Sequence, residues 1–264
     1  MGSVEDPFES SEFLLRRARV HFDNFEKAAA EYLNSDAYTV WHELNETTGL
    51  KEVKLKIVRE FPEDLRGYAS DAIKNIKDAL DQAMSAASYV VSGKRSKRTH
   101  FPFGEDADDL ENSLSRRKAG QCKGIPEELF PAIRYIRPYP HEGDRFRLKL
   151  LQKVSGPHKH SVSLALGIDS PSPFAKLDFI AENSVVVASV NFPEWDTTND
   201  EVVVATYSGD GKPILSHAFQ IEFSHPDLRG VSAWQLLSGW GGRAEWIVRG
   251  LKETATQIAG ERRN

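Results

Sequence analysis

The strongest constraint in this chain is a helical pattern across residues 64–92. Small and aliphatic side chains recur there at steps of three and four residues, at Ile73, Ile76, Leu80, Ala83, Ala87 and Val90. That spacing places them along one side of an α-helix, and polar residues repeat with the same period on another side. The apolar side includes alanines, which allow other helices to approach closely. We therefore predict that residues 64–92 form the central helix of a helical core.

A helix and a β-hairpin are predicted before the central helix. Residues 7–34 carry a stripe at helical spacing that consists of Leu14, Ala18, His21, Phe25, Ala28 and Tyr32. Residues 38–44 and 53–58 resemble strands, and the turn-forming stretch from Glu46 to Gly49 lies between them. Two such runs around a short turn predict a β-hairpin.

The segment after the central helix is strongly charged. A basic run at residues 94–98 precedes an acidic run at 105–111, which predicts an exposed loop. Phe101 and Phe103 lie between the two runs, and we expect their rings to be buried. Short helices are predicted at residues 108–118, 126–137 and 144–154.

In the last third of the chain the spacing of the apolar residues changes from a helical repeat to strict alternation. Strands are predicted around 162–166, 185–190, 202–207 and 219–223, and we expect them to form one antiparallel sheet. A final helix carries the stripe Leu236, Trp240, Ala244, Ile247, Leu251, Thr254 and Ile258. Its three tryptophans, Trp234, Trp240 and Trp246, are predicted to be core, whereas an exposed one would mark a protein interface.

The separation of helices from strands favours an α+β fold over an alternating parallel sheet. The prediction is a helical core with an N-terminal β-hairpin, followed by an antiparallel sheet and a C-terminal helix. Residues 1–157 would form the mainly helical part with the hairpin. Residues 158–264 would form the strands and the closing helix, packed with the first part as one compact unit.

Composition narrows the class of protein. The chain has 264 residues and a formal net charge of -5, which argues against a general nucleic-acid coat. Its single cysteine, Cys122, excludes an internal disulfide framework and fits a reducing compartment. No stretch approaches the apolar length of a membrane span. We therefore expect a soluble cytoplasmic protein that does not act at a membrane.

Several common catalytic motifs are missing from the sequence. It contains no Gly-x-x-x-x-Gly-Lys-Ser/Thr, Gly-x-Gly-x-x-Gly, Gly-x-Ser-x-Gly or His-Glu-x-x-His motif and no paired cysteine motif. Their absence disfavours nucleotide hydrolysis, dinucleotide oxidoreduction and serine-hydrolase chemistry. No cofactor is expected, and no metal site is assigned.

The first helix contains Arg17-Ala18-Arg19-Val20-His21, an Arg-Ala-x-x-His motif. This motif resembles the opening motif of a widespread family of uncharacterised bacterial proteins, and the resemblance extends along nearly the whole chain. The central helix retains Asp71, Ala72, Asn75, Ala79, Leu80 and Asp81, but has Lys77 and Gln82 where the family has Arg and His. Phe101-Pro102-Phe103, Ile125-Pro126 and Arg137-Pro138-Tyr139 follow in the family's order. Its final Asn-x-Asp-Lys-His-Arg motif retains only Lys159 and His160. The resemblance implies no known activity.

His21 is the first candidate site residue, because it lies on the apolar stripe of its helix. A histidine there is usually a satisfied core residue. The alternative is a site shared with Asp71, Asn75 or Asp81, if the two helices pack antiparallel across the hairpin. Polar groups retained in a helical core favour a site, because burying them is costly.

His158-Lys159-His160 forms the second candidate, where a helix gives way to a strand. Residues two apart on a strand share a face, so both imidazoles could bind a metal, although a third ligand would have to come from elsewhere. Alternatively, Arg145 or Arg147 with His158 or His160 would resemble the arginine–histidine motif of HEPN-type ribonucleases, at an imperfect spacing. The basic run at 94–98 offers phosphate contacts, but the acidic run beside it reduces the positive field.

Three functional hypotheses follow from these patterns. The preferred one is a non-enzymatic intracellular binding or interaction protein, whose partner is another protein, a small molecule or a second copy of the chain. The alternatives are a metal-independent HEPN-like ribonuclease or RNA-binding protein, and a metal-dependent hydrolase using His158 and His160. Binding of nucleic acid is disfavoured by charge but stays open, and so does the question of catalysis. The catalytic candidates are His21, Asp81 and His160, and the binding candidates are Asp71, Asn75, His158 and Lys159.

Overall fold

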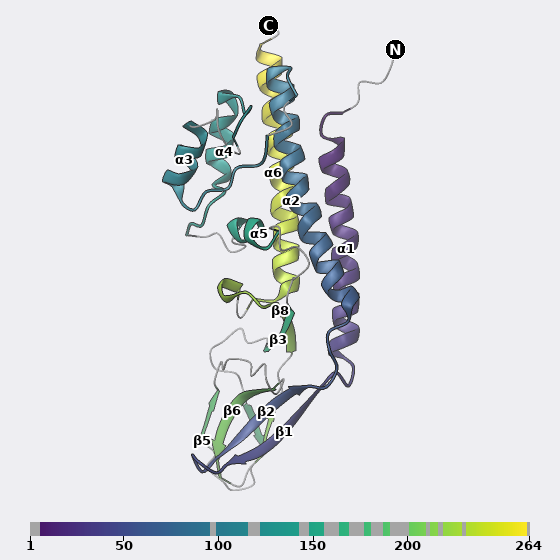
Figure 1. Ribbon diagram of the computed structural model, residues 1–264, viewed down its shortest axis with the longest axis vertical. Helices are drawn as coiled ribbons and strands as arrows, with labels where there is room; N and C mark the ends of the chain where they lie inside the picture. The colour runs from purple at the N-terminus through teal and green to yellow at the C-terminus, as the bar shows by residue number, and fades with distance from the viewer. Residues whose placement is uncertain are drawn as a thin grey trace. The chain divides into compact units, whose positions relative to one another are not determined.

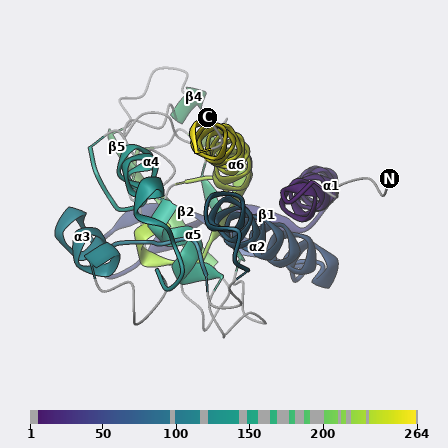
Figure 2. The same cartoon turned by 90° about the horizontal axis from the view of Figure 1, so that it is seen from above.

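The protein is described by a computed structural model (Figure 1, with a perpendicular view in Figure 2). It describes residues 6–95, 99–115, 122–142, 148–155, 164–168, 177–180, 187–190, 201–209, 212–215, 219–228 and 231–262. The chain divides into two compact units, each assembled from segments distant in sequence. The helical unit takes its described residues from 1–25, 66–162 and 234–264, and the sheet unit takes them from 26–65 and 163–233. The domain boundary predicted between residues 157 and 158 lies outside the described residues.

Three long helices dominate the part of the chain that the structure describes. They are α1 (Glu9–Leu33), α2 (Glu63–Ser92) and α6 (Ala233–Glu261). Their bounds confirm the helices predicted at 7–34, at 64–92 and at the end of the chain. None of these described helices combines the length and apolar character needed to cross a membrane.

The apolar stripes of these helices form the core of the helical unit. Leu80 of α2 and Trp240, Ile247 and Leu251 of α6 are all completely buried. Alanines alternate with these large side chains, and Ala79, Ala83, Ala87, Ala244 and Ala255 are equally inaccessible. Small residues at these positions let the helices approach each other, as the sequence pattern predicts.

Short helices cover further apolar surface in the same unit. They are α3 (Ala107–Ser115), the 3-10 turn η1 (Glu127–Leu129), α4 (Phe130–Ile136) and α5 (Leu148–Val154). The predicted extensions at residues 116–118 and 144–147 lie outside the described residues. Phe101 and Phe103 are buried as predicted, and their ring centroids lie 5.0 Å apart in an edge-to-face arrangement.

The predicted β-hairpin is confirmed as β1 (Tyr38–Asn45) and β2 (Leu50–Ile57), which pair antiparallel. At its turn the Gly49 N–H donates a hydrogen bond of 2.8 Å to the Asn45 carbonyl. Gly49 has a φ of 70°, a left-handed conformation that glycine adopts without steric cost. The turn residues and the flanking strand patterns in the sequence therefore both predict the hairpin that forms here.

The hairpin is part of a larger sheet, which differs from the prediction of a single sheet made only from late strands. Strand β2 pairs with β6 (Glu201–Ser208), and β6 pairs with β5 (Val187–Val190), so the order is β1-β2-β6-β5. The remaining described strands form two separate antiparallel pairs, β3 (Leu164–Ile168) with β8 (Phe219–Phe223) and β4 (Leu177–Ile180) with β7 (Lys212–Leu215). The fold is α+β, as predicted: the described strands all belong to the sheet unit, and most of the described helical residues belong to the helical unit.

Candidate functional site

The antiparallel course of α1 and α2 brings His21 close to Asp71. Their Nδ1 and Oδ2 atoms are 3.9 Å apart, too far for a hydrogen bond. The His21 side chain is 17% exposed, and its Nδ1 atom is buried without a hydrogen-bond partner. Asn75 belongs to the same surface of α2, but its Nδ2 donates to the Asp71 backbone carbonyl at 2.8 Å. Among the predicted site residues that the structure describes, only His21 and Asp71 therefore meet through their side chains.

Asp81 belongs to a different cluster. Its carboxylate, which is 13% exposed, accepts hydrogen bonds from the Lys77 side chain, from His100 Nδ1 at 3.2 Å and from the Phe101 backbone N–H at 2.9 Å. Asp81 is ten positions beyond Asp71 on the same helix, about 15 Å along the axis. Asp81 thus connects α2 to the segment that buries Phe101, and it does not join His21.

The second predicted site consists of residues around the His158-Lys159-His160 run. His158, Lys159 and His160, together with Arg145 and Arg147, lie outside the described residues. Among the residues that are described, no group of three His, Cys, Asp or Glu side chains could hold a metal ion. Cys122 is buried, and burial raises its pKa to about 11, so its thiol stays protonated at neutral pH.

A surface on α4 and α6 carries an ordered set of aromatic and basic side chains. The Tyr135 ring is 75% exposed and lies 5.8 Å from the Trp246 ring, at an interplanar angle of 39°. The Arg243 guanidinium lies 4.3 Å from the Trp246 ring centroid, within the range of a cation–π interaction. We call Tyr135, Trp246, Arg243 and the neighbouring Arg137 the Tyr135–Trp246 surface.

Local structure holds this surface in place. Helix α4 ends at Ile136, where Arg137 takes a left-handed conformation with a φ of 54°. The Ile136 carbonyl at this helix end accepts a hydrogen bond of 2.8 Å from Arg243, which fastens α4 to α6. Arg134 of α4 also donates to both carboxylate oxygens of Glu111, at 2.6 and 2.8 Å, and this bonding lowers the pKa of Glu111.

No pattern or motif considered in the sequence marked Tyr135 or Arg243 as a site residue. A usable signal was present, because residues 134–139 alternate basic and aromatic side chains around Ile136 and Pro138. The tryptophan prediction holds for Trp240, which is completely buried. It does not hold for Trp234, which is 43% exposed and lies 6.1 Å from the Phe22 ring.

No family model, curated protein or solved structure matches this chain. Assignment of a function therefore depends on the chemistry of the described side chains.

Proposed function

We propose that this chain is a non-enzymatic binding protein that recognises a protein partner through the Tyr135–Trp246 surface. The observation that carries the proposal is a tyrosine ring, 75% exposed, that lies against a tryptophan whose ring is also covered by an arginine. Tyrosine, tryptophan and arginine are the residues most enriched among the energetic centres of protein interfaces. Because neighbouring helices already hold these rings, binding would cost little side-chain entropy.

Charge around the rings indicates the chemistry of the partner. Arg137 lies 6.0 Å from the Tyr139 ring centroid and forms no ion pair with any carboxylate that the structure describes. Arg243 adds a second guanidinium, 4.3 Å from the Trp246 ring centroid. The partner segment would therefore place an apolar side chain on Tyr135 and carboxylates beside the two arginines.

The arrangement of the other candidate residues supports a binding scaffold. Asp81 accepts hydrogen bonds from three donors, and Asn75 is bonded to its own helix, which is typical of structural polar groups. The cytoplasmic location and the kinship with the bacterial family remain part of this proposal. The hydrolase alternative would need His158 and His160 together, and the ribonuclease alternative would need His158 or His160 beside Arg145 or Arg147.

Photo-crosslinking in cells tests the proposal. A photoreactive phenylalanine analogue replaces Tyr135, and the matched control carries it in place of Val20, an apolar residue on α1 that is 57% exposed. We expect a discrete protein adduct from position 135 and none from position 20. Trp246→Ala in the same chain should abolish the adduct, because the supporting ring is lost.

Two results would contradict this function. An adduct that is removed by ribonuclease would show that the surface binds RNA, as the second hypothesis holds. Equal adducts from positions 135 and 20 would show that position 135 has no specific partner.

A further inference from the structure

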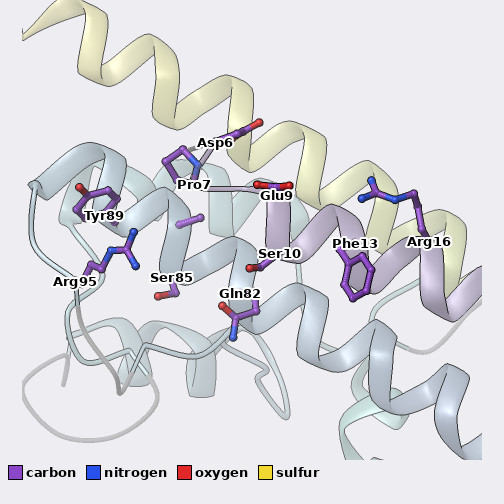
Figure 3. A pocket seen from close by; sticks show the side chains of 11 residues that line it. Asp6, Pro7, Glu9, Ser10, Phe13, Arg16, Gln82, Ser85, Tyr89 and Arg95 are labelled. Atoms are coloured by element: carbon purple, nitrogen blue, oxygen red, sulfur yellow. The ribbon is translucent and has the colours of Figure 1, made fainter. Parts of the chain in front are cut away.

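A cleft of about 410 Å³ lies in the helical unit between the start of α1 and the end of α2 (Figure 3). Ser10 of α1 faces Gln82 and Ser85 of α2 across it. The space exists because serine and alanine side chains occupy this part of the helix pair, where larger ones would fill it. Its volume falls within the range of small-molecule sites in proteins, about 300–1,000 Å³.

Two guanidinium groups line this cleft. Arg95, just beyond the end of α2, lies 5.0 Å from the Tyr89 ring centroid and points toward Ser85 (Figure 3). Arg16 of α1 lies 6.0 Å from the Phe13 ring centroid. Neither arginine forms an ion pair with a carboxylate within the described part of the chain. Stacking on a ring orients a guanidinium while leaving its N–H donors available.

The acidic groups in the lining do not cancel this charge. The charge of Asp6 is already paired, because its carboxylate accepts a hydrogen bond of 2.6 Å from Lys252 and another of 3.0 Å from the Phe8 N–H. Glu9 is the other carboxylate among the lining residues. Two guanidinium groups against one unneutralised carboxylate leave the cleft with an excess of positive charge.

We propose that this cleft binds a small aromatic anion, with its carboxylate or phosphate on Arg95 and its ring beside Phe13. The Arg95 fork provides paired N–H donors for an oxyanion, and the Ser10 and Ser85 hydroxyls supply further hydrogen bonds. Phe13 is 50% exposed at the cleft, so its ring offers apolar contact for the body of the ligand. This site is separate from the Tyr135–Trp246 surface and does not depend on it.

Calorimetric titration of the full chain with four matched probes tests the proposal. The probes are phenyl phosphate, benzoate, the neutral benzyl alcohol and the cationic benzylamine. We expect the two anions to bind and the neutral and cationic probes not to bind. The tighter of the two anions identifies the natural oxyanion as a phosphate or a carboxylate.

Substitutions inside and outside the cleft show whether the anion binds there. Arg95→Gln should weaken binding of the better anion at least tenfold, and Arg95→Lys should weaken it less, because a point charge remains without the fork. Arg66→Gln, which alters an exposed arginine at the other end of α2, should leave the affinity unchanged. A melting curve for each variant confirms that it is folded.

Three results would contradict the proposal that this cleft binds an aromatic anion. They are equal affinity for benzyl alcohol and the anions, unchanged affinity in Arg95→Gln, and no probe with a Kd below about 1 mM.

Discussion

His21 and Asp81 are both polar residues beside apolar helical stripes, and the structure gives them opposite environments. Asp81 accepts three hydrogen bonds, whereas the buried Nδ1 of His21 accepts none. A carboxylate that accepts three hydrogen bonds stabilises the fold, whereas a buried nitrogen without a hydrogen-bond partner reduces the stability of the fold. Substitutions at the two positions should therefore have opposite effects.

Asp81→Asn should lower the free energy of unfolding by about 1–3 kcal/mol, because it removes the charge that Lys77 and His100 bind. Denaturant titration measures the loss. Asp78→Asn is the matched control on the same helix and should change stability by less than about 0.5 kcal/mol. Tryptic cleavage near Arg95 should also become faster, since Asp81 holds the Phe101 backbone N–H. Wild-type stability in Asp81→Asn would show that the cluster is not structural.

His21→Leu should leave the free energy of unfolding unchanged or raise it by up to about 1 kcal/mol, because an apolar side chain of similar size replaces an unpartnered nitrogen. Denaturant titration again provides the measurement. A loss above about 1 kcal/mol would instead show that attraction to Asp71, 3.9 Å away, stabilises the helix pair.

Leu80→Ala should lower the free energy of unfolding by about 2–5 kcal/mol, the usual range for a completely buried leucine. Leu44→Ala is the comparison, because Leu44 is 56% exposed on β1 and its loss should have little effect. If Leu80→Ala cost less than about 0.5 kcal/mol, the apolar side of α2 would not be core.

At the scale of elements, one side chain joins the start of α1 to the middle of α6. Lys252 lies 2.6 Å from Asp6 Oδ2 and 2.7 Å from Glu12 Oε1. Its hydrogen bond lowers the pKa of Asp6, and the bond to Asp6 raises the pKa of Lys252. This link is partly exposed, so its contribution to stability should be at most about 1 kcal/mol.

Lys252→Met should therefore reduce stability in a pH-dependent way. The ionised Asp6 carboxylate stabilises the folded state fully at pH values above the pKa that this carboxyl has in the unfolded chain. This stabilisation is lost as pH falls through the lower pKa that the carboxyl has in the folded protein. The charged Lys252 amine stabilises the folded state fully at pH values below the pKa that this amine has in the unfolded chain. This stabilisation is lost as pH rises through the higher pKa that the amine has in the folded protein. The difference between wild type and variant should thus be constant from about pH 5 to 9 and shrink at both extremes. Melting curves across pH test this, and a difference that persisted below about pH 2 would contradict an ionic origin.

At the scale of the whole molecule, both units are completed by late segments of the chain. The helical unit needs α6, which contributes the buried Trp240, and the sheet unit needs β6, which pairs with β2. Residues 1–157 lack both elements. A hairpin without its neighbouring strand and two helices without their third would expose much apolar surface.

We therefore expect that the isolated fragment 1–157 lacks a cooperative thermal transition, whereas the full chain shows one. Circular dichroism at 222 nm during heating provides the measurement. Adding fragment 158–264 in equal amount should restore protection from proteolysis, because it supplies α6 and β6. A cooperative transition in fragment 1–157 alone would show that it is an independent domain.

The local patterns of the sequence determined which segments are helices and which form the hairpin. Helical spacing in α2 and α6 and the turn glycine at Gly49 express preferences of neighbouring residues, so they can be read without the fold. Burial of Phe101 and Phe103 was also predictable, because two adjacent rings in a charged loop are costly to leave in water.

Only the tertiary structure decided which distant segments meet. The pairing of β2 with β6 joins residues about 150 positions apart, and backbone hydrogen bonds between strands carry little sequence information about the partner. Asp81 and Tyr135 show the same limit for single side chains. The bonds of Asp81 to His100 and Phe101, and the contact of Tyr135 with Trp246, arise from how helices and loops pack. Spacing along one element shows which face a residue occupies, and packing between elements decides what that face contacts.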